Sequence, residues 1–265
     1  MTAWLNGRLV ANPGLDATDR GFTLGDGVFE TIRAACGRPC RLEAHLKRLA
    51  AGARLLDLSI PFDGEALGVA MRALLAKAGL SEAALRLTIS RGPAPRGLLP
   101  PAEAHPTVLI TAGPLPPPLP PARLVVAEIT RRNEHSPLSR IKSLNALDNI
   151  LARQEAARRG ADEAVLLNTA GRVAETTIAT LFALIDGRIV TPPAAEGALP
   201  GIARAVLLAG LEVAERPLTL AELRRADEIV LTNSLGLRPV ASLGGAALAT
   251  GGRLHAALAQ ALGAG

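Results

Sequence analysis

Apolar and polar residues follow two periods along this chain, one typical of strands and one typical of helices. Short segments rich in apolar and β-branched residues, several of them alternating in polarity, predict strands at Val28–Ile32, Leu85–Ser90, Thr107–Thr111, Leu124–Ile129, Glu163–Leu167, Leu181–Ile185 and Glu228–Thr232. Longer segments with apolar residues three or four positions apart predict helices at Leu42–Leu58, Leu67–Leu80, Ala146–Arg159, Ile202–Ala209 and Leu220–Arg224. Since both kinds of element occur in both halves of the chain, the pattern predicts an α+β fold.

Turn residues separate these elements. Asn6-Gly7 lies between two short apolar runs and predicts a tight hairpin, because both residues tolerate the positive φ angles of a type I′ turn. Asp19–Gly27 is rich in glycine and predicts a loop. Cys36 and Cys40 flank a further predicted turn.

A proline-rich segment divides the chain. Seven of the nine residues of Gly113–Pro121 are glycine or proline, and such a segment is a semi-rigid extended linker. The alternative, a proline-rich docking motif, is disfavoured between two predicted strands. We therefore predict an N-terminal α+β domain over 1–113, a linker over 114–121 and a C-terminal domain over 122–265.

Composition excludes several classes of protein. The 265 residues carry a formal net charge of +5, but the arginines are dispersed and only 2% of residues are aromatic, which argues against a nucleic-acid platform. An anionic small molecule suits this charge equally well. The chain has no basic start followed by an apolar segment, and no apolar run long enough to cross a bilayer, so we expect a cytoplasmic protein without membrane contact. The two cysteines are expected to be free thiols, and no metal site is expected.

One lysine is conspicuous. The chain has only three lysines among its 29 basic residues, and Lys142 lies just before the predicted helix at 146–159. Arginine cannot form an imine because its guanidinium stays protonated, whereas a lysine can. Lys142 is therefore a candidate Schiff-base residue; the alternative is a solvated lysine at a helix start.

A lysine that binds an aldehyde cofactor needs partners, and the sequence offers them. Glu175, between a turn and an apolar strand, could keep a pyridine nitrogen protonated. Gly197–Arg204 has the composition of a loop entering a helix, where the first free amides, Ile202 and Ala203, could bind an anion. Further donors to the same anion are Thr232, Asn233 and Arg48. Each of these residues could instead have an ordinary structural role, such as a surface acid or part of a loop that enters a helix.

The order of these motifs resembles the fold-type IV pyridoxal-phosphate enzymes, the class IV aminotransferase family. The resemblance runs from about Asn6 to Val240. The matching segments are Asp19-Arg20-Gly21, Gly25–Glu30, His45-x-x-Arg48-Leu49, Arg91-Gly92, Lys142–Asn145, Glu175 ahead of Leu181-Phe182, Gly201-Ile202-x-Arg204, and Thr232–Ser234 before Pro239-Val240. The family includes branched-chain aminotransferases, D-amino-acid aminotransferases and aminodeoxychorismate lyases.

The resemblance implies a fold, a cofactor and residue roles. It implies a small α/β N-terminal domain, a larger pseudo-barrel C-terminal domain and pyridoxal 5′-phosphate (PLP) as cofactor. Lys142 would hold PLP and move protons at the substrate Cα, and Glu175 would pair with the pyridine nitrogen. The phosphate would be bound by Arg48, by the backbone amides of Ile202 and Ala203, and by Thr232 and Asn233. A homodimer would place the active site between its two domains, near the subunit interface.

Departures from the family pattern bear on the reaction. Ala203 and Thr180 stand where many members have threonine and asparagine, which affects how the cofactor is held. The tyrosine that branched-chain enzymes place five residues after the lysine is Leu147 here, and the chain has no tyrosine. The carboxylate trap of the D-amino-acid enzymes is only partly present, since Arg96 matches but Leu98 and Phe29 replace its histidine and tyrosine.

Two observations favour aminodeoxychorismate lyase. The transaminase residues are missing, and the sequences of 135–142 and 231–235 resemble that branch of the family most. In this interpretation Phe29, Arg91 and Arg96 contact a dianionic substrate, and Lys142 shuttles the proton that frees pyruvate from 4-aminobenzoate. The alternatives are a PLP-dependent aminotransferase for D-amino or branched-chain amino acids, and a non-catalytic binding protein.

Overall fold

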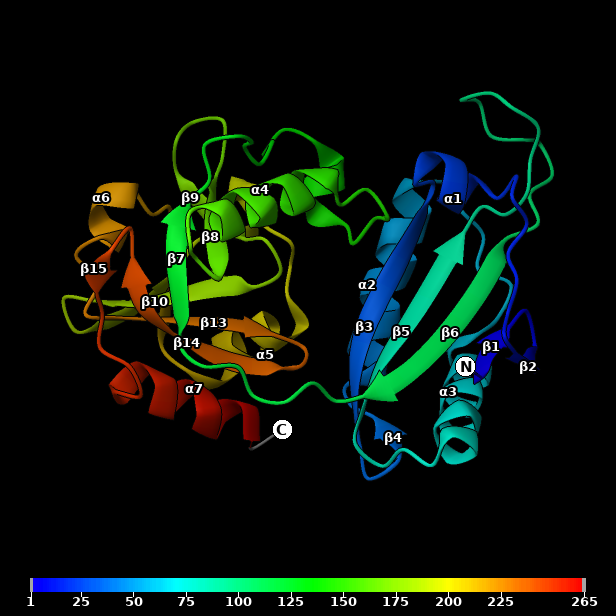
Figure 1. Cartoon of the computed structure of the whole chain (residues 1–265), viewed down its shortest axis with the longest axis horizontal. Coiled ribbons are helices and arrows are strands. Elements are labelled where there is room, and N and C mark those ends of the chain that lie inside the picture. Colours follow the sequence, from blue (N-terminus) through cyan, green and yellow to red (C-terminus); the bar gives the residue numbers. More distant parts are fainter. Residues whose placement is uncertain (1, 264–265) are drawn as a thin grey trace. The chain divides into compact units, whose positions relative to one another are not determined.

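The computed structural model describes residues 2–263, and the chain folds into two compact units (Figure 1). Within the described residues, unit 1 contains 2–116 together with Ile141–Asn145, and unit 2 contains Pro117–Arg140 and 146–263. The segment Ile141–Asn145, which carries Lys142, therefore lies with the N-terminal part of the chain. The sequence-based division did not anticipate this return, and the limits 1–113 and 122–265 stay a prediction.

Unit 1 is built on a six-stranded sheet in the order β2-β1-β6-β5-β3-β4. All its pairs are antiparallel. The strands are β1 (Thr2–Leu5), β2 (Arg8–Ala11), β3 (Gly27–Ala35), β4 (Arg38–Pro39), β5 (Ala83–Ser90) and β6 (Thr107–Pro114). The predicted hairpin turn is present, with φ of 45° at Asn6 and 96° at Gly7. Backbone angles of that sign suit the right-handed twist of the two flanking strands.

Two helices, α2 (Leu42–Leu55) and α3 (Gly64–Ala78), pack on one face of this sheet (Figure 1). Alternation along β3 turns Val28, Ile32 and Ala34 toward the helices, where they are buried with the apolar faces of both. Helix α3 begins where the Asp63 carboxylate accepts a hydrogen bond from the Ala66 amide and ends at Gly79 in a left-handed conformation. The opposite face of β3 is left for Phe29, Thr31 and Arg33, which are only partly buried.

The segment predicted as a glycine-rich loop contains a short helix, α1 (Arg20–Leu24). Its start is capped by the Asp19 carboxylate, which accepts a hydrogen bond from the Gly21 amide at 2.7 Å. It ends at Gly25, whose φ of 69° is readily adopted by glycine. Asp19 and Gly25 thus delimit one short helix, and the loop prediction was wrong for these five residues.

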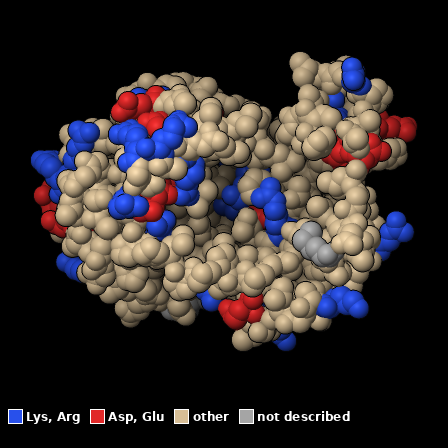
Figure 2. All heavy atoms as spheres, in the orientation of Figure 1, with Lys and Arg blue, Asp and Glu red and all other residues tan. Residues whose placement is uncertain are grey.

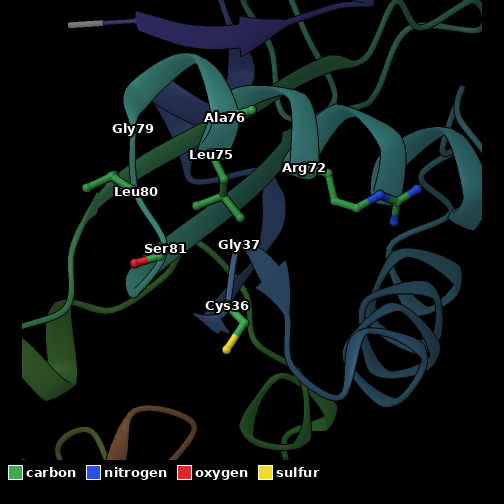
Figure 3. A pocket seen from close by; sticks show the side chains of 8 residues that line it. All are labelled: Cys36, Gly37, Arg72, Leu75, Ala76, Gly79, Leu80 and Ser81. Carbon is green, nitrogen blue, oxygen red and sulfur yellow. The ribbon is translucent and has the colours of Figure 1, made fainter.

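A shallow cavity of about 310 Å³ lies at one end of unit 1, by the C-terminus of α3 (Figure 3). Its lining consists of Cys36, Gly37, Arg72, Leu75, Ala76, Gly79, Leu80 and Ser81. None of the candidate site residues is among them. Cys36 and Cys40 are free thiols, as predicted.

Unit 2 contains a curled sheet of nine strands in the order β12-β11-β10-β13-β14-β7-β8-β9, with β15 paired to β14. The strands are β7 (Ala122–Val126), β8 (Glu163–Leu167), β9 (Val173–Thr176), β10 (Thr180–Ile185), β11 (Arg188–Thr191), β12 (Val213–Glu215), β13 (Glu228–Asn233), β14 (Gly236–Leu243) and β15 (Ala246–Ala247). Most pairs are antiparallel, while β7 pairs in parallel with both β14 and β8, and β11 pairs in parallel with β12. Near-complete burial of β8 and β10 accounts for their apolar runs, Ala164–Leu167 and Leu181–Ile185. Strand β9 is buried as well, but it carries the polar residues Glu175 and Thr176.

Four helices accompany the sheet of unit 2: α4 (Leu147–Arg158), α5 (Ile202–Gly210), α6 (Leu220–Leu223) and α7 (Arg253–Gly263), with short 3₁₀ turns at Pro137–Arg140 and Ala194–Glu196. Leu207 of α5 and Leu254 and Leu258 of α7 are buried with Phe182 and Val230 of the sheet. The Glu228 carboxylate, on β13, accepts hydrogen bonds from the Gly252, Leu254 and His255 amides and so caps the start of α7.

Basic side chains on the face drawn in Figure 2 occur in several separate groups, some with acidic side chains beside them. This agrees with the dispersed arginines of the sequence. Among residues 2–263, no helix is long and apolar enough to cross a membrane.

Candidate active site

Lys142 is held against strand β3 of unit 1. The Phe29 amide donates a hydrogen bond to the Lys142 carbonyl at 2.9 Å, and the Leu144 amide donates to the Gly27 carbonyl at 2.9 Å. The Lys142 Nζ atom lies 4.4 Å from the centroid of the Phe29 ring. A cation over an aromatic face is stabilised by the quadrupole of the ring. The structure therefore brings two predicted site residues, Lys142 and Phe29, into contact.

A third residue, Arg86 of β5, joins them. Its guanidinium carbon lies 3.8 Å from the centroid of the same Phe29 ring, and its Nε donates to the Thr88 hydroxyl at 3.2 Å. Burial lowers the pKa of this arginine from its ordinary value. Sequence reasoning missed Arg86. The available signal was a charge in the middle of an apolar strand, at a position that alternation directs away from the core.

Arg48 forms a buried cluster with Glu30 and His45 on the helix-covered side of β3. The fully buried Glu30 carboxylate accepts hydrogen bonds from Arg48 Nε at 2.8 Å and Nη2 at 2.6 Å. His45 Nδ1 lies 2.7 Å from the same carboxylate. Burial alone would raise the pKa of Glu30, but the hydrogen bonds and the positive charge of its partners outweigh it and hold the pKa below 4.5. The guanidinium of Arg48 is thereby fixed in one orientation.

Glu30→Gln is expected to lower the free energy of unfolding by about 3 kcal/mol at pH 7, because it removes one partner of a buried ion pair. The folded-state pKa of Glu30 lies below its ordinary value, so its stabilisation is complete above about pH 4.5 and is lost as the pH falls through the lowered pKa. Urea unfolding of the wild type and the variant between pH 7 and pH 3.5 should show the difference in their free energies of unfolding becoming smaller toward pH 3.5. A difference that does not change with pH would contradict this prediction.

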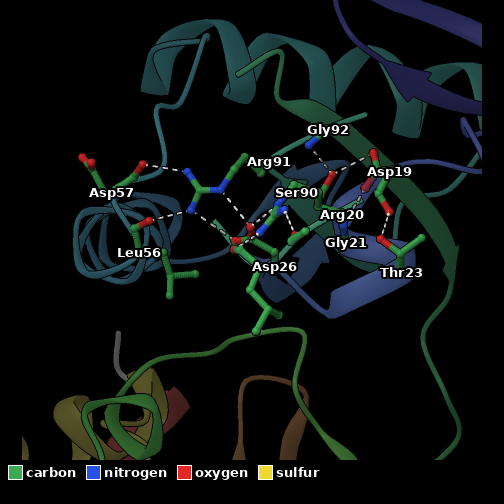
Figure 4. Close-up of polar contacts among 12 residues, drawn as sticks. Asp19, Arg20, Gly21, Thr23, Asp26, Leu56, Asp57, Ser90, Arg91 and Gly92 are labelled. Atoms are coloured by element: carbon green, nitrogen blue, oxygen red, sulfur yellow. Dashed lines mark hydrogen bonds and ion pairs between the residues drawn. The ribbon is translucent and has the colours of Figure 1, made fainter. Parts of the chain in front are cut away.

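Arg91 lies in a different setting from the one predicted for it. It is 5% exposed, and its guanidinium donates to Asp26 and to the Leu56 and Asp57 carbonyls (Figure 4). Asp26 also accepts from Arg20 at 2.8 Å. Burial would raise the pKa of Asp26, but both arginines lower it further than burial raises it. These contacts favour a framework role for Arg91 over substrate binding.

Arg96 is exposed and lies in the stretch between β5 and β6. Two carbonyls of this stretch, those of Gly97 and Leu98, accept hydrogen bonds from Arg20 at 2.8 Å each. These bonds tie the stretch to α1, and the substrate role of Arg96 stays a prediction.

Glu175 is a buried carboxylate in unit 2, on β9. One oxygen lies 3.1 Å from Arg132 Nε, and the other accepts a hydrogen bond from the Leu199 amide at 3.0 Å. The side chains of Glu175 and Arg132 are 8% and 14% exposed. A charged acid held in this way suits a protonated ring nitrogen, whose charge it would offset. Arg132 is a second residue that sequence reasoning missed.

The segment predicted as an anion cradle leads into helix α5 of unit 2, as expected. Helix α5 begins at Ile202, so the amides of Ile202 and Ala203 lie in its first turn, where they have no carbonyl partner within the helix. Gly201 precedes them. A Cβ at Gly201 would come within 2.9 Å of the Thr180 hydroxyl, so only glycine lets the backbone approach β10 this closely.

Thr232, the further anion donor predicted for this cradle, lies on the strand next to β10. It pairs with Thr180 across β13 and β10, which places the two side chains on the same face of the sheet. Thr232 is 2% exposed, and its hydroxyl has no hydrogen-bond partner among the described residues. A buried hydroxyl without a partner is costly, and a bound anion at the cradle would supply one. Asn233 uses its side-chain oxygen to accept from the Leu235 amide at 2.9 Å.

The sequence also identifies the protein family to which this chain belongs. The sequence model of the family described as amino-transferase class IV matches residues 27–243. The chain belongs to the class IV aminotransferase family. Membership confirms the predicted α+β fold class and the resemblance to fold-type IV enzymes. It also confirms PLP as the cofactor, and the cradle and the buried acid of unit 2 fit its phosphate and its ring nitrogen.

Similar proteins within the family differ in their reactions. The chain is 35% identical over 243 residues to a candidate branched-chain-amino-acid aminotransferase of Methanocaldococcus jannaschii, covering 88% of this chain and 84% of that protein. The solved 4-amino-4-deoxychorismate lyase of Pseudomonas aeruginosa is 36% identical, with a TM-score of 0.85 and coverage of 98% and 97%. The PLP-bound form of a Mycobacterium tuberculosis protein described as a hypothetical aminotransferase is 26% identical, with a TM-score of 0.86 and coverage of 100% and 98%.

The family therefore establishes a PLP-dependent enzyme and leaves lyase and aminotransferase open. Assembly as a homodimer stays a prediction. No group of three or more His, Cys, Asp or Glu side chains able to hold a metal ion occurs within residues 2–263.

Proposed function

We propose that this chain is a PLP-dependent 4-amino-4-deoxychorismate lyase, which releases pyruvate and leaves 4-aminobenzoate, a folate precursor. The observation that carries the proposal is the pair of cations, Lys142 and Arg86, on the Phe29 ring. The substrate carries two carboxylates, and an arginine that shares an aromatic ring with the reactive lysine offers one of them a charge-assisted contact. The chain also lacks the tyrosine of the branched-chain enzymes and the histidine of the D-amino-acid carboxylate trap.

The residues predicted to hold the cofactor each receive a role in this proposal. Lys142 binds the cofactor and acts on the substrate, and Glu175 pairs with the ring nitrogen. Arg48, the amides of Ile202 and Ala203, and Thr232 with Asn233 hold the phosphate. Ala203 contributes only its backbone amide, where many relatives have a threonine hydroxyl. When bound, PLP supplies the electron sink for the carbanion that forms at the substrate carbon.

Lys142 moves one proton in the proposed reaction. Its amine removes the proton from the ring carbon that bears the substrate amino group. It returns a proton to the methylene carbon of the enolpyruvyl group as the bond between the ether oxygen and the ring breaks. The methylene becomes the methyl group of pyruvate, and the ring becomes aromatic. The atoms balance without a second substrate, which distinguishes this reaction from transamination.

Arg86→Gln is expected to raise KM for 4-amino-4-deoxychorismate about 10- to 100-fold, because a charged hydrogen bond to a carboxylate is lost. We expect a smaller effect on kcat, since Arg86 contacts the substrate and not the transferred proton. Steady-state kinetics of the variant measure both constants.

Arg91→Gln is the matched control for this variant. Its guanidinium is occupied by Asp26 and two carbonyls, so its loss should lower the melting temperature and leave KM within about twofold. An unchanged KM in Arg86→Gln, or a KM effect confined to Arg91→Gln, would remove Arg86 from the substrate site.

Thr232→Val is expected to raise the dissociation constant of PLP about tenfold while the apoprotein melts at the same or a higher temperature. The substitution removes a buried hydroxyl that has no partner in the described protein and that the phosphate would use. Thr191→Val is the control, because the equally buried Thr191 hydroxyl donates to the Leu181 carbonyl at 2.8 Å. That variant should lose stability and keep its affinity for PLP.

The second candidate is a class IV aminotransferase for D-amino or branched-chain amino acids. The aminotransferase relative from M. jannaschii favours it. Pyruvate release from 4-amino-4-deoxychorismate, measured beside a transamination panel of D-amino and branched-chain acids with a 2-oxo acid acceptor, separates the two. The lyase proposal predicts turnover of the chorismate derivative, and turnover only in the panel would refute it.

A further inference from the structure

One guanidinium of unit 2 is bonded to three segments that the proposed site uses. Arg132 Nε lies 3.1 Å from Glu175 and also donates to the Gly197 carbonyl at 3.0 Å. Arg132 Nη2 donates to the Ser139 carbonyl at 2.9 Å. Gly197 begins the segment that leads to the cradle at Gly201, and Ser139 lies three residues before Lys142 in the chain.

The backbone of Arg132 is fixed as firmly as its side chain. Its amide donates to the Leu167 carbonyl at 2.9 Å, and it forms a bridge with Asn168 at the end of β8. Two carbonyls and one carboxylate therefore surround a guanidinium whose side chain is 14% exposed. Because guanidinium is planar and presents its donors in a fixed fork, these partners determine the direction from which it meets Glu175.

The charge of Arg132 matters as much as its direction. Glu175 is buried, and burial favours the neutral form of a carboxyl group, while a guanidinium 3.1 Å away favours the ionised form. A neutral acid would not offset a protonated ring nitrogen. Arg132 and the Leu199 amide contact different oxygens of Glu175, so the two contacts do not compete for one oxygen.

We infer that Arg132 is a positioning residue that keeps Glu175 ionised and correctly oriented toward the cofactor ring. The inference rests on the proposed role of Glu175. Arg132 does not contact the reacting atoms. It acts through Glu175. Its hydrogen bonds to the Gly197 and Ser139 carbonyls also link the cradle segment and the segment before Lys142 to one guanidinium.

The test measures PLP binding to the full-length apoprotein between pH 5.5 and pH 8.5, with absorbance as the readout. The variants are Arg132→Gln, Arg132→Lys and Glu175→Gln. The matched control is Arg131→Gln, since the exposed Arg131 donates to the Ala127, Glu128 and Thr130 carbonyls and so holds no part of the site. Wild-type protein is measured at the same pH values, which accounts for the titration of PLP itself.

Arg132→Gln should raise the dissociation constant of PLP about tenfold at pH 8.5 and by a larger factor at pH 6, because Glu175 then takes up a proton more readily. Arg132→Lys, which keeps the charge, should recover most of the loss at pH 6, and Arg131→Gln should stay within about twofold of wild type. A second readout is the melting temperature of the apoprotein. Adding Glu175→Gln to Arg132→Gln should restore it in part, since no unpaired buried charge then remains.

Two outcomes would overturn the inference in distinguishable ways. If Glu175→Gln weakens PLP binding but Arg132→Gln follows the wild-type pH profile, Arg132 has only a structural role and the proposed function stands. If Glu175→Gln itself leaves PLP binding and its pH dependence unchanged, the assigned role of Glu175 fails, and the role of Arg132 fails with it.

Discussion

Replacing Lys142 by alanine is expected to lower turnover of 4-amino-4-deoxychorismate by at least about 10³-fold. Lys142 is the proposed covalent anchor of the cofactor and the base that moves the substrate proton, and a positioned base alone contributes about 10²- to 10⁴-fold. The same variant should lose the visible absorption of covalently bound PLP. Steady-state assays of pyruvate release, with absorption spectra of the purified protein, measure both effects.

Lys142→Arg separates chemistry from charge. Arginine keeps the positive charge that lies over the Phe29 ring, but its guanidinium cannot form an imine. The variant should therefore fold as the wild type does and be as inactive as Lys142→Ala. Lys47→Ala, at another of the three lysines, should retain full activity. Activity of Lys142→Arg within about tenfold of wild type would mean that another group performs the chemistry.

Glu175→Gln is expected to lower kcat about 10²- to 10³-fold, the range measured when one electrostatic stabiliser is removed from an active site. Glutamine preserves the shape and can still accept from the Leu199 amide, but it carries no charge to offset a protonated ring nitrogen. The loss should appear in kcat more than in KM, because the charge matters most when the carbanion forms. Single-turnover measurements with saturating substrate give the relevant rate.

Glu196→Gln provides the control for this substitution. Glu196 is similarly buried, and it accepts hydrogen bonds from Asn168 and Arg172. Its replacement should reduce stability without a comparable loss of kcat. Equal losses of kcat in the two variants would indicate that Glu175 acts by supporting the fold.

Local signals predicted most elements of this fold. Strand β8 coincides with the predicted Glu163–Leu167, and α5 begins at the predicted Ile202 because Pro200 and Gly201 precede an amphipathic run. The hairpin at Asn6-Gly7 follows from the same kind of signal. These features depend on residues within a few positions of each other, which is why one sequence suffices to predict them.

Other elements depend on partners far away in the chain. Helix α7 was not predicted, and its first amides are capped by Glu228, a strand residue more than twenty positions earlier. Helix α1 lies in a glycine-rich segment and is held by Asp19, which also accepts from the Ser90 and Thr107 hydroxyls. No local pattern reveals such long-range bonds.

The site residues divide in the same way. Lys142 and Glu175 could be named from motif order, whereas Arg86 and Arg132 needed the structure. Arg86 and Lys142 share the Phe29 ring only because β3 and β5 pair in register and because residues 141–145 return to β3. Arg132 meets Glu175 across forty-three positions of sequence. Conversely, Arg91 was given a substrate role because of its motif, and its buried contacts favour a framework role.

The central claim is that Lys142 forms the covalent bond to the cofactor. Reduction of the PLP-loaded protein with borohydride, followed by peptide mass spectrometry, tests this directly, because reduction makes an imine bond permanent. We expect a phosphopyridoxyl adduct on the peptide that contains Lys142 and on neither Lys47 nor Lys77. An adduct on either of those lysines in place of Lys142, or a reduced protein without any adduct, would contradict the claim.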